Sequence, residues 1–219
     1  MNKPSLMTTM AAGVLAAAAV IAGVPAGPAA ADDCPDVELI FARGTGEPPG
    51  PGRVGQALAD ALVPQLGGRS LNVYGVDYPA SLNFLNASSG ADDAAARIAD
   101  MGARCPQTRL VLGGFSQGAA AVSMLAGVPP VGDRIGSIGS APPLPPDAAG
   151  QIAAVAVFGN PGARFGSPLS TAGAFAGRAI DMCATGDPIC SDGRDRAAHS
   201  AYELPPYPQQ AAAFVAALL

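Results

Sequence analysis

The sequence predicts an α/β protein in which helices cover both faces of a central parallel sheet. Short apolar runs alternate along the chain with segments whose apolar residues recur at helical spacing. Most of these runs are unbroken, which is typical of parallel strands that are buried on both faces. A third observation is a glycine-flanked serine, Ser116, at the junction of one run and one helical segment. We therefore expect a single sheet of five parallel strands.

The N-terminal segment has the pattern of a secretory signal peptide. One positive side chain, Lys3, precedes an apolar run at 11–24, and small residues lead up to Ala31. A membrane anchor is the alternative, but the run is short, rich in alanine and glycine, and followed by prolines. We expect residues 1–31 to be removed, residues 32–219 to form a single domain, and the protein to be secreted.

The first half of the domain alternates between strand and helix. Residues 37–42 are apolar and predict the first strand, which a proline- and glycine-rich loop follows. Residues 54–66 carry apolar side chains at the spacing of an amphipathic helix. Residues 71–78 predict the second strand, which Pro79 stops. Residues 92–104 predict a helix, because acidic residues fill its first turn and an arginine ends it, as the helix dipole favours.

The C-terminal half continues the same alternation with longer connections. Residues 129–150 are rich in proline and glycine and predict an irregular connection at the rim of the sheet. The apolar run at 152–158 predicts the fourth strand, and residues 179–184 predict a shorter fifth strand. Residues 206–219 predict an apolar helix that ends the chain.

Ser116 lies at the centre of a Gly-x-Ser-x-Gly pattern at 114–118. Residues 109–112 before it fit a buried third strand, and residues 119–126 after it are good helix formers. A serine at such a sharp turn sits in strained backbone, so its neighbours two residues away must lack bulk. The helix N-terminus behind it favours developing negative charge. We interpret Ser116 as a nucleophile; the alternative is an ordinary N-capping serine in a glycine-rich turn.

An activated serine needs a base and a group that orients the base. His199 is the single histidine of the chain, and it lies downstream of Ser116, just before the last expected helix. In this architecture the order serine, acid, histidine is expected. We therefore predict that His199 is the base, although a lone histidine can also be structural.

Four aspartates lie between the last strands and the histidine: Asp181, Asp187, Asp192 and Asp195. Asp187 lies between two cysteines whose disulfide would lock its position, and an orienting group needs that rigidity. Asp181 is expected within a strand, and the other two flank an expected solvated turn. We predict Asp187 as the acid; the alternative is a residue that caps its own loop through an Asx-turn.

An oxyanion hole needs donors aimed at the negative charge that develops on the substrate. Gln117 supplies a backbone N–H directly after the predicted nucleophile. Thr45 follows the first expected strand, where its N–H and its hydroxyl can face Ser116. The alternative for Thr45 is a turn residue that bonds its own backbone.

Four cysteines, an even number in a chain expected to be exported, predict two disulfides with three possible connectivities. We favour the pairs Cys34–Cys105 and Cys183–Cys190, because the first ties the N-terminus to the domain and the second closes a local loop. A metal site is the alternative, but the chain has no Cys-x-x-Cys spacing and only one histidine.

The charge pattern limits the expected partners. The chain has a formal net charge of −5, and its only lysine lies in the expected signal peptide. No basic cluster is present, so we expect no nucleic-acid partner and no electrostatic attraction to anionic membranes. No segment after residue 31 is long and apolar enough to span a bilayer.

Five segments occur in a fixed order along residues 32–219: Ala42-Arg43-Gly44-Thr45, Gly114-Phe115-Ser116-Gln117-Gly118, Phe158-Gly159-Asn160-Pro161, the loop from Cys183 to Cys190 with Gly186-Asp187-Pro188, and His199. Taken together they resemble the cutinase family, in particular its actinobacterial, mycobacterial-type members, over essentially the whole of this range. One difference is that fungal members have serine then threonine where this chain has Thr45 and Gly46. Threonine keeps the hydroxyl but has fewer rotamers.

The resemblance implies an α/β-hydrolase with a five-stranded parallel sheet, no metal and no organic cofactor. It implies Ser116 as nucleophile, Asp187 as acid, His199 as base, Thr45 and Gln117 as the oxyanion hole, and the disulfide pairing given above. It also implies an ester or lipid substrate rather than an amide. We expect a monomeric serine esterase.

The acyl-binding surface is expected to be apolar and open, because no long insertion offers a lid. Candidates for its rim, which can equally pack inward, are Phe84, Leu85, Leu144, Leu169, Phe175 and Leu204. We expect short to medium acyl chains, including cutin or lipid esters. Alternatives are a phospholipase, thioesterase or acetylxylan esterase on the same frame, or a secreted binding protein or antigen with a weak site.

Overall fold

Five parallel strands form one sheet, as the apolar runs predict, and the strand order is β2-β1-β3-β4-β5. A computed structural model describes Met1 and residues 34–128 and 138–219 of the chain. All six residues of β1 are buried, as are six of the seven in β3, because both faces of these central strands are covered. The strands are β1 Val37–Ala42, β2 Leu71–Gly75, β3 Arg109–Phe115, β4 Ile152–Phe158 and β5 Ala179–Met182.

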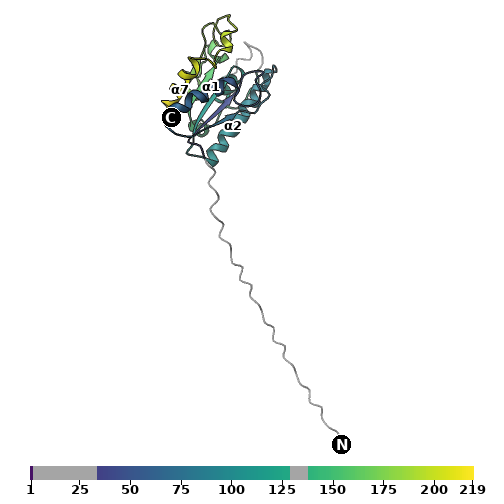
Figure 1. Cartoon of the computed structure of the whole chain (residues 1–219). Coiled ribbons are helices and arrows are strands. Elements are labelled where there is room, and N and C mark those ends of the chain that lie inside the picture. The colour runs from purple at the N-terminus through teal and green to yellow at the C-terminus, as the bar shows by residue number, and fades with distance from the viewer. Residues whose placement is uncertain (2–33, 129–137) are drawn as a thin grey trace. The chain divides into compact units, whose positions relative to one another are not determined.

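Helices cover the two faces of the sheet and form two separate cores (Figure 1). Leu39 and Phe41 of β1 pack with α1 and α7, whereas Ile40 between them packs with α2 and α3. This alternation follows from the two-residue period of a strand. The helices are α1 Gly52–Leu62, α2 Ala87–Arg104, α3 Gln117–Leu125, α5 Pro146–Gln151, α6 Pro161–Arg164 and α7 Tyr207–Ala216. Short 3₁₀ turns are η1 Val63–Gln65, η2 Phe84–Asn86, η3 Gly173–Phe175 and η4 Ala198–Ser200.

The start of α2 differs from the prediction, and the acidic residues that were expected in its first turn lie further along the helix. The helix begins at Ala87, five residues before the expected start, and its first turn contains no acidic residue. Asp93 instead accepts hydrogen bonds from the Asp77 N–H and the Tyr74 hydroxyl. A run of small residues lets the first turns of α2 approach the core, where Gly90 lies against the ring of Tyr78.

Two short helices lie where the sequence predicted no helix. The helix α5 ends the connection at 129–150, and α6 follows β4 directly. The Asn160 side chain caps α6 by accepting a hydrogen bond from the Gly162 N–H at 2.9 Å. Helices of four to six residues carry too few turns to show a periodic apolar pattern.

Two disulfides join the cysteines in pairs. Cys34 bonds to Cys105, at the C-terminus of α2, and Cys183 bonds to Cys190 across a loop after β5. Within the described ranges no helix could cross a membrane, and no cluster of three or more His, Cys, Asp or Glu side chains could hold a metal ion. The predicted signal peptide, apart from Met1, lies outside the described residues.

Candidate active site

The backbone at Ser116 forms a sharp, strained turn between β3 and α3. Its φ of 54° and ψ of −112° lie in a region that non-glycine residues rarely adopt. Its N–H donates to the Phe158 carbonyl at 2.9 Å, which ties the turn to the end of β4. Backbone strain of this kind costs about 1–3 kcal/mol and persists only where the surrounding structure enforces it. The turn therefore presents the serine hydroxyl at the carboxyl edge of the sheet.

The two glycines of the pattern are required by close packing rather than by a positive φ. A Cβ at Gly118 would lie 2.0 Å from the Ala42 carbonyl oxygen, at the end of β1. A Cβ at Gly114 would lie 2.5 Å from the Gly118 carbonyl oxygen. The first turn of α3 thus lies directly against the ends of β1 and β3, which brings Ser116 close to the loop that carries Thr45.

His199 connects the serine to a carboxylate. Its Nε2 lies 2.9 Å from the Ser116 hydroxyl oxygen, and its Nδ1 lies 2.8 Å from an Asp187 carboxylate oxygen. The imidazole ring is held between aromatic neighbours, with centroids 5.0 Å from Phe115 and 6.1 Å from Tyr202. The structure therefore brings the predicted nucleophile, base and acid into one hydrogen-bonded chain.

Asp187 is completely buried yet remains an acceptor for several donors. Its carboxylate accepts from His199, from the Tyr202 hydroxyl at 2.5 Å and from the Ile189 N–H at 2.7 Å. Burial raises the pKa of Asp187, but these hydrogen bonds together outweigh it, and the pKa lies below the ordinary aspartate value. The bond to Ile189 is the Asx-turn that was considered as the alternative, so the two roles coexist in one side chain.

Tyr202 belongs to this cluster, although no sequence pattern singled it out. Its side chain is fully buried, and its hydroxyl donates to Asp187 while it accepts from the Ala184 N–H at 2.9 Å. Burial, followed by the hydrogen bond to Asp187, raises the pKa of Tyr202. The phenol therefore acts as a neutral donor. The only sequence signal is its position three residues after His199, which by itself is weak.

The other three candidate aspartates have partners other than His199. Asp181, in β5, accepts from the Asn160 side chain and from the Ser170 N–H, both at 2.8 Å. The Asp192 side chain is 98% exposed. Asp195 accepts from the Ala197 N–H at 2.9 Å. Among the four, Asp187 bonds the imidazole.

Thr45 and Gln117 meet beside the serine. Gln117 is the first residue of α3, so its N–H is one of those that a helix leaves without an internal partner. The Thr45 hydroxyl lies 3.1 Å from the Gln117 side-chain oxygen, whereas the buried Nε2 of the same amide has no hydrogen-bond partner among the described residues. Rotating the amide by 180° would let Nε2 donate to Thr45 and would leave the hydroxyl hydrogen free to point elsewhere.

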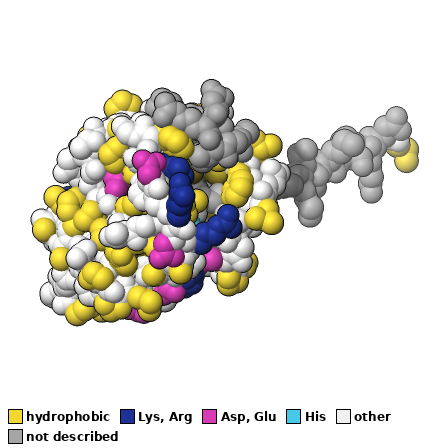
Figure 2. Space-filling model, turned by 90° about the horizontal axis from the view of Figure 1, so that it is seen from above, with side chains coloured by type: hydrophobic (Ala, Val, Ile, Leu, Met, Phe, Trp, Pro, Cys, Tyr) yellow, Lys and Arg dark blue, Asp and Glu magenta, His cyan; other side chains and the backbone are white. Residues whose placement is uncertain are grey.

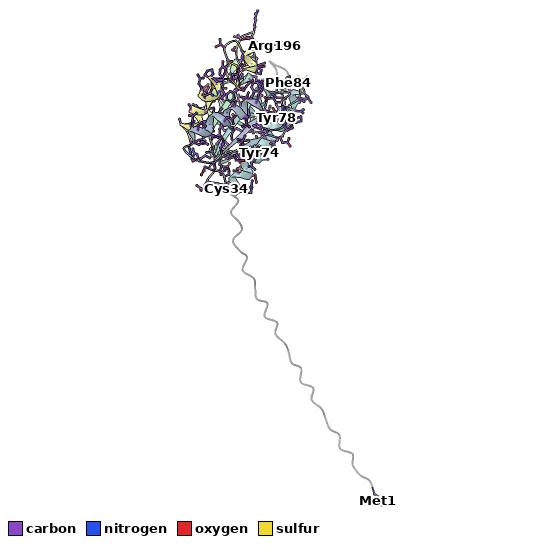
Figure 3. All side chains as sticks on the ribbon, viewed as in Figure 1. Met1, Cys34, Tyr74, Tyr78, Phe84 and Arg196 are labelled. Atoms are coloured by element: carbon purple, nitrogen blue, oxygen red, sulfur yellow. A yellow bond between two sulfur atoms is a disulfide. The ribbon has the colours of Figure 1, made fainter. Side chains whose placement is uncertain are left out.

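A mainly apolar cleft of about 360 Å³ opens over the serine. On its wall, Leu82 is 83% exposed and Phe84 is 42% exposed. Phe84 lies toward the end of the domain opposite Cys34 (Figure 3). The charged side chain of Arg164 also lines it. The lining is completed by Thr45, Ser116, Gln117, Ala120, Ile138, Pro161, Pro188, Ile189 and His199.

The six apolar residues considered for the rim divide between the cleft and the core. Phe84 lines the cleft, whereas Leu85 and Leu204 are exposed and are not part of its wall. Leu144, Leu169 and Phe175 are buried in the core on the α2–α3 face of the sheet. Sequence reasoning missed Leu82, Ile138 and Ile189, which reach the cleft from connecting segments where periodicity gives no direction.

A parallel sheet that presents a strained serine next to a His–Asp pair defines a serine hydrolase of the α/β-hydrolase fold. The cutinase family matches residues 33–219 of the chain. Phospholipase Culp4 of Mycobacterium tuberculosis is 46% identical over 211 residues, which cover 96% of this chain and 90% of that protein. Probable carboxylesterase Culp3 of the same organism is 50% identical over 188 residues, covering 84% of this chain and 70% of that protein.

A solved structure of a cutinase is also similar to this chain in both sequence and fold. The cutinase of Trichoderma reesei, determined with a phosphonate inhibitor, is 34% identical with a TM-score of 0.66, and the match covers 86% of this chain and 78% of that one. The chain belongs to the cutinase family. It is a serine carboxylic ester hydrolase.

Proposed function

We propose that this protein is a secreted esterase that cleaves carboxylic esters by two-step acyl transfer through Ser116. The observation that carries the proposal is the position of His199, which lies within hydrogen-bond distance of both the Ser116 hydroxyl and the Asp187 carboxylate. That arrangement lets one imidazole take a proton from the serine while the carboxylate holds its other nitrogen in the protonated form.

The steps follow from these contacts. The Ser116 oxygen attacks the ester carbonyl carbon while its proton passes to His199 Nε2, which gives a tetrahedral intermediate. As the intermediate collapses, the bond to the alcohol oxygen breaks, His199 returns the proton to that oxygen, and an acyl-serine remains. Water then attacks the acyl carbon, again with His199 as base, and the carboxylic acid leaves as Ser116 recovers its proton. Asp187 stays ionised and orients the ring throughout.

The oxyanion of each intermediate is stabilised by the N–H groups of Gln117 and Thr45 and by the Thr45 hydroxyl. The Gln117 N–H begins α3, so the positive end of the helix dipole adds to it. Gln117 Nε2 has no hydrogen-bond partner within the part of the chain that the structure describes, which supports the rotated amide. In that orientation Nε2 donates to the Thr45 oxygen, and the Thr45 hydroxyl hydrogen points toward the cleft. The hydroxyl then donates to the oxyanion without losing a buried hydrogen bond.

The acyl group occupies the apolar cleft over Ser116. A volume of about 360 Å³ lined by Leu82, Phe84 and Ile189 accommodates a short to medium chain and leaves its far end exposed. The exposure of Leu82 and Phe84 supports an open site that takes dispersed esters as well as ester surfaces. Cutin and lipid esters both meet this description.

Phospholipid esters are the second candidate, and Arg164 is the observation that favours them. Its side chain lines the same cleft as Ser116, and its Nη1 donates to the Pro188 carbonyl. Asp192, 3.5 Å from Nε, is almost fully exposed and screens this charge only weakly. Figure 2 shows apolar side chains beside basic ones on the face seen from above. A guanidinium beside an apolar wall suits a phosphodiester attached to acyl chains.

Secretion and a monomeric state complete the proposal. The family match begins at residue 33, close to the expected cleavage site after residue 31, and both disulfides suit an oxidising compartment. We propose a signal peptide at 1–31 and one catalytic domain at 32–219 that acts as a monomer.

Hydrolysis of nitrophenyl esters from acetate to palmitate tests the function. We expect turnover that is highest for short and medium chains below the concentration at which the substrate aggregates, and none for Ser116→Ala. Activity that rises only above substrate aggregation would contradict the open site. A folded wild type without any turnover would favour the binding-protein alternative.

For the phospholipid candidate, Arg164→Gln should slow the release of fatty acid from a short-chain phosphatidylcholine but not the hydrolysis of nitrophenyl butyrate.

A further inference from the structure

Arg53, near the start of α1, reaches across the molecule to the segment that carries His199. Its side chain is 41% exposed and contacts three segments that are distant in sequence. None of these contacts was expected from the sequence, because Arg53 lies in a proline- and glycine-rich stretch without a periodic pattern. Each of the three segments carries a group that the proposed mechanism uses.

The first contact is with the loop that carries Thr45. The Glu47 carboxylate accepts from the Gly44 N–H at 2.6 Å and from the Arg53 N–H at 3.1 Å, and it lies 3.2 Å from Arg53 Nε. Only 11% of the Glu47 side chain is exposed, so solvent weakens this ion pair less than a surface pair. A Cβ at Gly52 would lie 2.5 Å from Glu47 Oε2, so glycine there leaves room for the carboxylate.

The second contact is with the base. Arg53 Nη1 donates to the Ser200 carbonyl at 2.8 Å and to a Glu203 carboxylate oxygen at 2.6 Å. Ser200 directly follows His199 in the 3₁₀ turn η4. The bond therefore fixes the backbone that supports the imidazole, across a sequence separation of 147 residues.

The third contact is with Phe115, the residue directly before Ser116. The Arg53 guanidinium carbon lies 5.6 Å from the centroid of the Phe115 ring, within the range of a cation–π interaction. Phe115 precedes Ser116, and its ring lies 5.0 Å from the His199 ring. One side chain thus contacts the loop at 43–47 that carries Thr45 (the oxyanion loop), the segment at 198–203 that carries His199 (the base segment), and Phe115.

We propose that Arg53 is a positioning residue and that the Glu47–Arg53 bridge holds the oxyanion loop and the base segment in register with Ser116. This inference rests on the proposed function, because it concerns the geometry of that reaction. The guanidinium suits the task, because its planar fork forms an ion pair with Glu47 through Nε and donates to the Ser200 carbonyl through Nη1 at the same time. Glu47 is mostly buried, but the Arg53 side chain is 41% exposed, so solvent still screens the pair in part. We therefore expect the bridge to act mainly on the geometry of the site rather than on stability.

The test compares four proteins by kcat and KM for nitrophenyl butyrate and by melting temperature: wild type, Arg53→Met, Arg53→Lys and Arg109→Met. Methionine keeps the apolar stem over Phe115 but has no donor. We expect kcat of Arg53→Met to fall by roughly tenfold or more, since small displacements of reacting groups are costly, with KM within about twofold. Lysine keeps the charge but cannot bond both partners in the same way, so its kcat should lie between those of Arg53→Met and wild type.

Arg109→Met is the matched control. It removes the same charge from an exposed arginine at the start of β3 that bonds the Leu218 carbonyl, and its kcat should equal that of wild type. The inference is overturned if Arg53→Met has the kcat of wild type or if Arg53→Lys is no faster than Arg53→Met. It is also overturned if the kcat of Arg109→Met falls as far as that of Arg53→Met. Absence of turnover in the wild type would contradict the proposed function instead.

Discussion

The Thr45 hydroxyl is the part of the proposed oxyanion hole that mutagenesis can remove while the backbone stays unchanged. Valine has the same shape as threonine and keeps the N–H, so Thr45→Val isolates the hydroxyl. We expect kcat for nitrophenyl butyrate to fall by about 10²-fold, as it does when one oxyanion donor is lost elsewhere, whereas Thr45→Ser should stay close to wild type. A Thr45→Val enzyme within twofold of wild type would leave the two N–H groups as the sole donors.

Asp187 makes a prediction about stability and pH. Its pKa is lowered in the folded protein, so its contribution to stability is complete above the unfolded value of about 3.9 and is lost as pH falls through the lower folded value. We expect the difference in unfolding free energy between wild type and Asp187→Asn to narrow as the pH falls below about 4. Urea unfolding at several pH values measures it, and a difference that stays constant to pH 3 would contradict the hydrogen-bonded carboxylate.

At the residue scale, the sequence predicted the groups that have a distinct chemical signature. Ser116 lies in a motif with a physical reason for each glycine, and His199 is the single histidine, so few choices remained. Tyr202 and Arg53 were missed because their importance depends on which atoms they reach: one donates to Asp187 and the other bonds Glu47 and Ser200. Such contacts between distant segments leave no local pattern in a sequence.

The first turn of α3 is held against the sheet by a glycine that tolerates no side chain. We expect Gly118→Ala to destabilise the protein by about 3 kcal/mol or more, since its Cβ would overlap the Ala42 carbonyl. Gly150→Ala in α5 is the matched control, because nothing lies within 4 Å of its Cβ and alanine favours a helix by about 0.5–1 kcal/mol. Unfolding in urea compares the two; equal effects would contradict the close approach of α3 to β1.

At the element scale, prediction succeeded where burial gives a strong pattern. All five strands were expected from apolar runs, and their parallel arrangement is confirmed. The predicted strand ends were less accurate than the strands themselves. β2 ends at Gly75 rather than at residue 78, and β3 extends to Phe115 rather than to residue 112. The β3 extension contains two glycines whose role is packing against α3 and Phe41, which hydrophobicity does not record.

The two disulfides lie in different parts of the molecule and should have separable effects. Cys34–Cys105 closes a long loop away from Ser116, whereas Cys183–Cys190 encloses Asp187. On the loop-entropy model we expect losses of about 4 and about 2.5 kcal/mol, respectively, when each pair is replaced by serine. Only the Cys183/Cys190 replacement should lower kcat of the folded enzyme. Urea unfolding and ester assays measure both, and equal losses of kcat would contradict a specific role for the second disulfide in holding Asp187.

The central claim for the whole molecule is that its fold activates one serine. The most direct measurement is the reaction of purified, oxidised protein with a fluorophosphonate probe, followed by intact mass and peptide mapping. We predict one adduct per wild-type molecule, located on Ser116, and no adduct on Ser116→Ala or His199→Ala that retain the wild-type circular dichroism. A folded wild type that remains unlabelled, or a Ser116→Ala protein labelled to the same extent, would contradict the account.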